Sequence, residues 1–169
     1  METQTDRWPD GACAAVSFSF DDARLSQVEV GLPLLDGLGV RATFYLSPDN
    51  LAKQVVRWRR AAEVGHELGN HTVHHPCSRN FAFARDHALE EYDLRMMGAE
   101  CDEANDRIRE MTGAAPATFA YPCGQTYVGS GVSTLSYVPV VAERFLAARC
   151  FAEGAVNDPE FCNQHLLAA

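Results

Sequence analysis

Basic residues are scarce in this sequence. It holds 14 lysines and arginines against 23 aspartates and glutamates, which gives a formal net charge of −9, and its densest basic stretch is the short RWRR at 57–60. Binding to DNA or RNA relies on cationic side chains placed against the phosphates. The charge balance therefore argues against a nucleic-acid partner and is typical of an acidic, soluble surface.

Long apolar runs are also missing. No stretch approaches the roughly 18 apolar residues that a membrane-spanning helix needs. The opening METQTDRWPDG lacks the charged and then apolar layout of a secretory signal. We therefore expect no membrane partner and a cytoplasmic location for the chain.

Closely spaced cysteines are absent as well. Cys123 lies in a loop between Pro122 and Gly124, but a thiol nucleophile needs a nearby base, which the sequence does not place. Free, mostly buried thiols are the expectation, because the six cysteines lack the short spacing that holds a structural zinc or forms a redox couple. They are Cys13, Cys77, Cys101, Cys123, Cys150 and Cys162.

What the chain does have is a regular alternation of strand and helix patterns. With 169 residues, 47% of them hydrophobic, it fits one domain over residues 1–169. Strand–helix units in series favour an α/β fold of mostly parallel strands, either an open sheet or part of a barrel, with functional residues at the carboxyl ends of the strands. The patterns predict strands at 16–20, 41–47, 66–71 and 117–122, and helices within 26–40, 51–65, 86–111 and 137–150.

The first predicted strand ends on two adjacent carboxylates. In VSFSFDDA, Val16, Phe18 and Phe20 share one parity, which predicts a strand with one well-buried face. Asp21 and Asp22 follow directly, and two like charges side by side need a counter-charge or water. A solvated turn is one way to satisfy them, since aspartate is a common turn residue.

Three of the six histidines fall within GNHTVHHP, at the end of the third predicted strand. His71 and His75 are four residues apart, so in a helical turn their imidazoles would project from one side while His74 points elsewhere. A surface cluster without a ligand is the alternative. Joined to a carboxylate from another strand end, the two histidines make a set that suits zinc or a similar divalent ion, and the neighbouring aspartate could act as a base.

Three segments together resemble a known family. SFDDA, HTVHHP and AYPCG are similar, in order and spacing, to the first three motifs of the polysaccharide deacetylases, the carbohydrate esterase family 4 proteins with a NodB-homology domain. The resemblance implies a distorted (β/α) barrel. It also implies Asp21 as the catalytic base, Asp22, His71 and His75 as ligands of a divalent metal, zinc in the first place, and Thr72 as a supporting residue.

The third of these motifs is implied to shape the substrate groove. Its residues here are Tyr121, Pro122, Cys123 and Gly124, and a backbone N–H at or near Cys123 would donate to the oxyanion. The match has one clear departure. Ala120 occupies the place where the family usually has an arginine that braces the catalytic aspartate.

The later family motifs, one of which carries a histidine that acts as general acid, have no match in this sequence. The chain stops near its fifth strand–helix unit, so the resemblance implies an incomplete barrel. Its first and last strands would have exposed edges through which chains could self-associate. His165, in NQHLLAA, is the only histidine beyond the third motif, and its surroundings do not resemble the later motif.

The function implied by the resemblance is metal-dependent hydrolysis of carbon–nitrogen amide bonds other than peptide bonds, with an N-acetylated sugar or polysaccharide as substrate. A divalent cation would lower the pKa of a bound water, and Asp21 would take the proton of that water as it attacks. Two alternatives stay open. The chain could hydrolyse another small amide or a cyclic imide, or it could be a catalytically incompetent fragment that binds metal or sugar.

Overall fold

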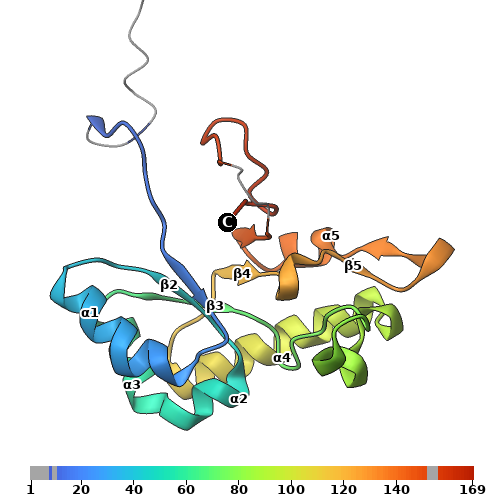
Figure 1. Cartoon of the computed structure of the whole chain (residues 1–169), viewed down its shortest axis with the longest axis horizontal. Coiled ribbons are helices and arrows are strands. Elements are labelled where there is room, and N and C mark those ends of the chain that lie inside the picture. Colours follow the sequence, from blue (N-terminus) through green and yellow to red (C-terminus); the bar gives the residue numbers. More distant parts are fainter. Residues whose placement is uncertain (1–7, 9–10, 152–155) are drawn as a thin grey trace, which may run out of the picture.

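The structure, a computed structural model, describes residues 8, 11–151 and 156–169. Its main sheet has five strands in the order β1-β2-β3-β4-β7, and every pairing in it is parallel. The sheet curls into a half-barrel with helices outside it, which confirms the incomplete distorted (β/α) barrel that the sequence predicts (Figure 1). The strands are β1 (Ser19–Asp21), β2 (Thr43–Leu46), β3 (Glu67–Asn70), β4 (Thr118–Ala120) and β7 (Ala147–Arg149).

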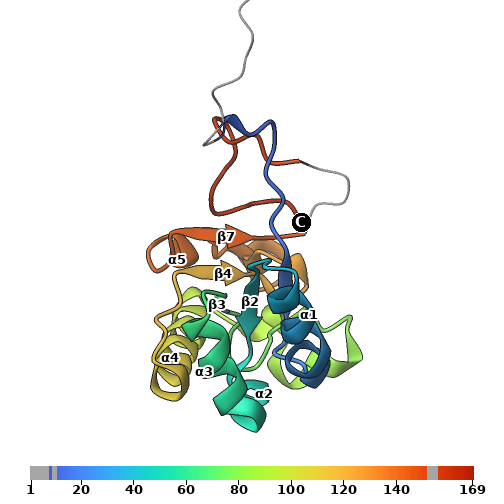
Figure 2. The same ribbon diagram turned by 90° about the vertical axis from the view of Figure 1, so that its left-hand side faces the viewer.

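Helices cover one side of this sheet. Figures 1 and 2 show α1, α2, α3 and α4 together on that side, while the segments 11–18 and 156–169 extend from the other. No helix in the described part of the chain is both long and apolar enough to cross a membrane. The α-helices are α1 (Leu32–Gly37), α2 (Pro48–Leu51), α3 (Val55–Glu63), α4 (Leu94–Thr112) and α5 (Val138–Ala142).

The hydrophobic core has two parts. One lies under β1, β2 and β3 and includes the fully buried Phe44 and Trp58. The other surrounds β4, β7 and α5 and includes the fully buried Phe119 and Tyr137. Because the strands are parallel, the residues that follow β1, β3 and β4 all emerge at one edge of the sheet, so the three motifs of the sequence meet there.

The first strand is shorter than the sequence predicts. Val16 and Phe18 are 78% and 49% exposed, because segment 11–18 leaves the sheet before β1 begins (Figure 1). Phe20 packs inward, stacked on Phe44 with ring centroids 5.2 Å apart. The predicted buried face is therefore wrong for Val16 and Phe18 and holds only for Phe20.

The helix predicted at 86–111 begins only at Leu94. Asp93 caps it, since its carboxylate accepts a hydrogen bond from the backbone N–H of Met96 at 2.7 Å. Short 3-10 turns precede the cap, at Ala82–His87 and Leu89–Glu91. The predicted stop at Gly113 is confirmed, with φ +79° in the left-handed region that glycine adopts without strain.

The helix predicted at 137–150 is split in the structure. Pro139 lies in its first turn as predicted, but α5 ends at Ala142. Residues 147–149 pair in parallel with β4 instead, and this tertiary contact overrides the local helical preference of the alanines. A short antiparallel hairpin, β5 (Tyr127–Val128) and β6 (Leu135–Ser136), precedes the helix.

The outer edge of β7 is covered by a later segment of the chain. The Ala148 N–H donates to the carbonyl of Gln164 at 2.8 Å, and the Leu167 N–H donates to the carbonyl of Ala148 at 2.9 Å. The expectation of an exposed edge at this last strand is therefore wrong, because residues 164–167 supply the missing partners. Self-association of the chain stays a prediction.

Candidate metal and catalytic site

The two aspartates sit at the turn that follows β1. Asp21 is the last residue of the strand, and the Asp22 N–H donates to the carbonyl of Tyr45 at 3.0 Å. Asp22 has φ +78° and Ala23 has φ +53°, both in the left-handed region that non-glycine residues rarely adopt. Because of this turn, the two carboxylates point in different directions, and each has its own partners.

The histidine segment after β3, residues 71–75, is a loop rather than the helical turn that the spacing suggested, and we call it the histidine loop. Thr72 and His75 have φ +61° and +51°, and the Thr72 hydroxyl accepts a hydrogen bond from the His75 N–H at 3.1 Å. The Asn70 side chain accepts from the Thr72 N–H at 2.8 Å and donates to the carbonyl of Cys101 on α4 at 2.9 Å. Thr72 therefore supports the loop from within, as the family resemblance implies, while Asn70 ties the loop to α4.

This loop brings His71 and His75 to the same carboxylate oxygen. Oδ1 of Asp22 lies 3.5 Å from Nε2 of His71 and 3.7 Å from Nε2 of His75. The imidazole rings meet edge to face, with centroids 4.8 Å apart. The three ligand atoms lie within 4.8 Å of one another, so the structure brings together the three residues predicted to hold a metal.

The protonation of His71 fits a metal ligand. Its Nδ1 lies 2.9 Å from the carbonyl oxygen of Ala120, which can only accept, so Nδ1 carries the proton and Nε2 presents a lone pair toward Asp22. Burial lowers the pKa of His71, which favours the neutral ring that a metal requires. Two imidazole nitrogens and a carboxylate suit zinc or another divalent cation with open positions. The donors therefore fit the metal that the family resemblance implies.

The second carboxylate is held by an arginine from the far end of the sheet. A guanidinium N–H of Arg149 donates to Oδ1 of Asp21, and the same guanidinium lies over the ring of Tyr45, 5.1 Å from its centroid. Arg149 is the direct β-sheet partner of Ala120. An arginine therefore reaches Asp21 from the strand next to Ala120, although position 120 itself carries none.

Asp22 has a cationic neighbour of its own. The Arg24 guanidinium donates two hydrogen bonds to Oδ2 of Asp22, at 2.8 and 3.0 Å, from a side chain that is 70% exposed. This contact occupies the oxygen that faces away from the histidines. Oδ1 therefore stays directed at the two imidazoles.

His74 points away from this group, as the sequence predicts. Its Nδ1 lies 2.6 Å from Oε1 of Glu100, and its ring stacks on His87 with centroids 4.2 Å apart. Glu100 also accepts hydrogen bonds from the backbone N–H groups of Val73 and His74 and from the Tyr92 hydroxyl. Burial alone would raise the pKa of Glu100, but the hydrogen bonds from His74 and Tyr92 hold it below its usual value.

Sequence reasoning missed Glu100 because it looks like an ordinary helix residue in α4. Its relative exposure is only 7%. Charged residues are seldom so buried unless they are paired, and here the carboxylate fixes the histidine loop to α4.

The third motif is only partly accessible. Tyr121 is buried in the second core, and its hydroxyl donates to the carbonyl of His165 at 2.9 Å; Pro122 is buried too. The Tyr121 side chain therefore packs inward, and the substrate-binding role of residues 121–124 stays a prediction. Cys123, at φ +53°, and Gly124 remain accessible. A side chain on Gly124 would meet the backbone of Phe151 at 2.9 Å.

His165 and Cys77 have structural partners. Nε2 of His165 lies 3.0 Å from the carbonyl of Phe145, so this ring is engaged away from the aspartates. Sγ of Cys77 lies 3.5 Å from Nδ1 of His75, and burial raises the pKa of Cys77. A thiol of raised pKa is a poor nucleophile.

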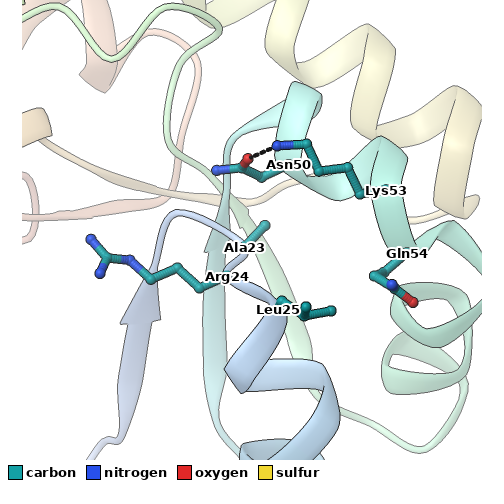
Figure 3. Close-up of a pocket in the computed structure, with 6 residues that line it drawn as sticks. All are labelled: Ala23, Arg24, Leu25, Asn50, Lys53 and Gln54. Carbon is teal, nitrogen blue, oxygen red and sulfur yellow. Dashed lines mark hydrogen bonds between the residues drawn. The ribbon is translucent and has the colours of Figure 1, made fainter. Parts of the chain in front are cut away.

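A pocket opens beside the turn that carries Asp22. It has a volume of about 410 Å³ and is lined by Ala23, Arg24, Leu25, Asn50, Lys53 and Gln54 (Figure 3). Asn50 anchors this wall to the turn, since its side-chain amide donates to the carbonyl of Asp22 at 2.9 Å. Lys53 in turn donates to the Asn50 side chain at 2.8 Å.

Comparisons with known proteins show what this chain is similar to. The chain is 30% identical over 97 residues to the uncharacterized protein YlxY of Bacillus subtilis, a match that covers 57% of this chain and 27% of YlxY. The structure resembles the Streptococcus pyogenes deacetylase PplD in complex with acetate, with a TM-score of 0.71 and 18% identity over 93% of this chain and 64% of PplD.

A second similar solved structure is that of a BA3943 mutant, which is described as a CE4 family pseudoenzyme with restored enzymatic activity. The TM-score is 0.52 and the identity 20%, over 64% of this chain and 36% of that one. At these identities the two solved structures show a shared fold, and this chain spans only part of each relative's length. The family model of the polysaccharide deacetylases matches residues 9–134. The chain therefore belongs to the polysaccharide deacetylase family.

Proposed function

We propose that this chain is a metal-dependent hydrolase that removes the acetyl group from an N-acetylated sugar or polysaccharide. The observation that carries the proposal is the convergence of Asp22, His71 and His75 beside a second carboxylate, Asp21, held by Arg149. Membership of the polysaccharide deacetylase family supports the same reaction.

The proposed reaction divides the work between two carboxylates. A divalent cation held by Asp22, His71 and His75, zinc in the first place, would supply Lewis acidity toward the acetyl carbonyl. Asp21 takes the proton of the attacking water at Oδ2, the oxygen that Arg149 does not hold, and this proton passes to the amine nitrogen as the carbon–nitrogen bond breaks. Arg149 keeps the carboxylate aimed and balances its charge.

Cys123 contributes its backbone N–H rather than its thiol in this proposal. The left-handed turn at 122–124 presents the residue on the accessible side of the motif. A backbone donor aimed at the developing oxyanion is typically worth about 10²- to 10³-fold in turnover. This role does not depend on the side chain, so a cysteine at this position is compatible with the proposed reaction.

The pocket beside Asp22 offers a place for the sugar. Asn50, Lys53 and Gln54 line it with groups that can donate hydrogen bonds to hydroxyl oxygens. Its neighbour Asp22 belongs to the proposed metal set, so a sugar seated there would lie next to the reacting centre.

Asp21→Asn is the variant that tests the proposal. An amide is nearly isosteric with a carboxylate but does not accept the proton. The zinc-loaded variant should therefore keep its metal and lose acetate release from acetylated chito-oligosaccharides by about 10²- to 10⁴-fold. Asp106→Asn changes an exposed aspartate on α4 and should release acetate at the wild-type rate.

Three results would contradict the proposal in different ways. Near-normal turnover by Asp21→Asn would remove Asp21 as the base. A wild-type chain that hydrolyses a small amide or a cyclic imide but no acetylated sugar would show that the substrate is not a glycan. A chain that binds zinc and hydrolyses none of these would be a non-catalytic binding protein, on a fold that it shares with a pseudoenzyme.

A further inference from the structure

Two cysteines lie against the side of His75 that the proposed catalytic metal does not use. One nitrogen of His75 and the sulfur atoms of Cys77 and Cys123 all lie within 4.8 Å of one another. Cys77 follows the histidine loop and is fully buried, whereas Cys123 belongs to the turn after β4 and is exposed. Residues far apart in the sequence thus build a compact group with one nitrogen and two sulfur atoms.

The imidazole of His75 separates this group from the first one. Its Nε2 faces Oδ1 of Asp22 at 3.7 Å, and its Nδ1 faces Sγ of Cys77 at 3.5 Å. Both His75 and Cys123 are held in left-handed backbone conformations, at φ +51° and +53°. A left-handed conformation is strained for a non-glycine residue and persists only where the surrounding structure fixes it. The two residues are therefore held in place.

We propose that His75, Cys77 and Cys123 form a second cation position, selective for soft, thiophilic divalent ions such as Cd²⁺. Thiolate ligands favour soft metals, whereas the carboxylate and two imidazoles of the first position suit zinc and harder ions. On binding, each thiol releases its proton to solvent and the sulfur bonds to the cation. The exposed Cys123 gives the ion a route in and leaves a side open for water.

The two positions compete for His75. A neutral imidazole has one proton and one free lone pair, so it coordinates one ion at a time unless the ring loses its remaining proton. A soft cation at Cys77 and Cys123 therefore withdraws His75 from Asp22 and His71.

The test is a cadmium titration of the reduced, metal-free full chain, followed by the near-ultraviolet absorption of cadmium–thiolate bonds. Wild-type protein should reach saturation at about one Cd²⁺ per chain at low concentration, with a thiolate signal. Cys77→Ser and Cys123→Ser should each lower that signal by about half or more, since each removes one of two thiolates. Cys150→Ser is the matched control and should keep it.

Variants of the first position separate this proposal from the catalytic one. Asp22→Asn and His71→Ala should keep the cadmium signal, because neither residue belongs to the second set, whatever their effect on acetate release. An unchanged signal in Cys123→Ser would overturn the proposal, and this exposed change leaves the core intact. Loss of the signal in Cys150→Ser, or in His71→Ala, would also overturn it, since the ion would then use other ligands.

Discussion

Two groups of side chains meet at the histidine loop, and they differ in how completely their polar atoms are hydrogen-bonded. The open group consists of Asp22, His71 and His75, with the Nε2 atoms of the two histidines 3.5 and 3.7 Å from Oδ1 of Asp22. Those separations exceed the usual hydrogen-bond length and leave room for a cation between the atoms. On the other side, the closed group of His74, His87, Tyr92 and Glu100 is joined by close contacts, including a 2.6 Å bond.

The difference shows how a short loop can combine rigidity with an unfilled ligand set. The carboxylate of Glu100 accepts four hydrogen bonds and fixes the loop to α4. With the loop fixed in this way, the Nε2 atoms of His71 and His75 stay aimed at Oδ1 of Asp22. A site of this kind is preorganised, because its geometry does not have to be created when the ion arrives.

Removing a member of the open group should have the largest effect on metal binding. His71→Ala deletes a predicted ligand, so its loss of zinc affinity should exceed the roughly 10- to 100-fold that removal of an outer partner of a ligand costs. The measurement is the zinc content of the purified protein after dialysis against a competing chelator.

His74→Ala is the matched change on the closed side of the same loop. This variant should retain its zinc, because its ring faces Glu100 rather than Asp22. If His74→Ala lost zinc while His71→Ala kept it, the assignment of the two groups would be reversed.

The contrast between the groups also shows what the sequence could predict. The spacing of His71 and His75 and the carboxylates at another strand end predict the site, since the carboxyl ends of parallel strands lie at one edge of the sheet. Arg149 could not be found in this way. It is 128 residues from Asp21 along the chain, and the segment around it favours a helix locally. Only the pairing of β7 with β4 brings it beside Ala120.

Local patterns failed where tertiary contacts decide the outcome. Val16 and Phe18 have the alternation of a strand, but segment 11–18 leaves the sheet and their side chains stay exposed. Glu100 has the sequence context of a solvent-facing helix position, yet it is buried by the histidine loop. The left-handed conformations of Thr72 and His75, which make the histidines converge, leave no signal in residue type, because both are ordinary L-residues.

Breaking the closed group should reduce stability rather than remove a ligand. Glu100→Ala leaves buried donors without an acceptor, among them the Val73 N–H and the Tyr92 hydroxyl, so we expect a loss of about 2–4 kcal/mol in the free energy of unfolding. Chemical denaturation of the metal-free protein measures this loss.

Glu103→Ala, on the same helix, is the control for that change. Its carboxylate is more than half exposed, and its pairing with Arg107 at 3.7 Å is a surface contact, so its effect should stay within about 0.5 kcal/mol. Equal losses in the two variants would mean that the hydrogen bonds to Glu100 contribute nothing beyond an ordinary surface contact.

The smallest expected effect is a pH dependence that belongs to the closed group. The pKa of Glu100 lies below its ordinary value of 4.5, so the folded state binds a proton at this carboxyl less readily than the unfolded chain does. Its contribution to stability is therefore fully present above about pH 4.5 and is lost as the pH falls through the folded pKa.

Glu100→Gln keeps the shape of the side chain but does not titrate. The difference in unfolding free energy between wild type and Glu100→Gln should narrow as the pH is lowered from about 6 to about 3. Other acidic residues, such as Glu90, titrate in both proteins, so their contributions cancel in this difference. A difference that stayed constant over this range would show that the carboxylate charge does not hold the loop, and that the closed group works through shape alone.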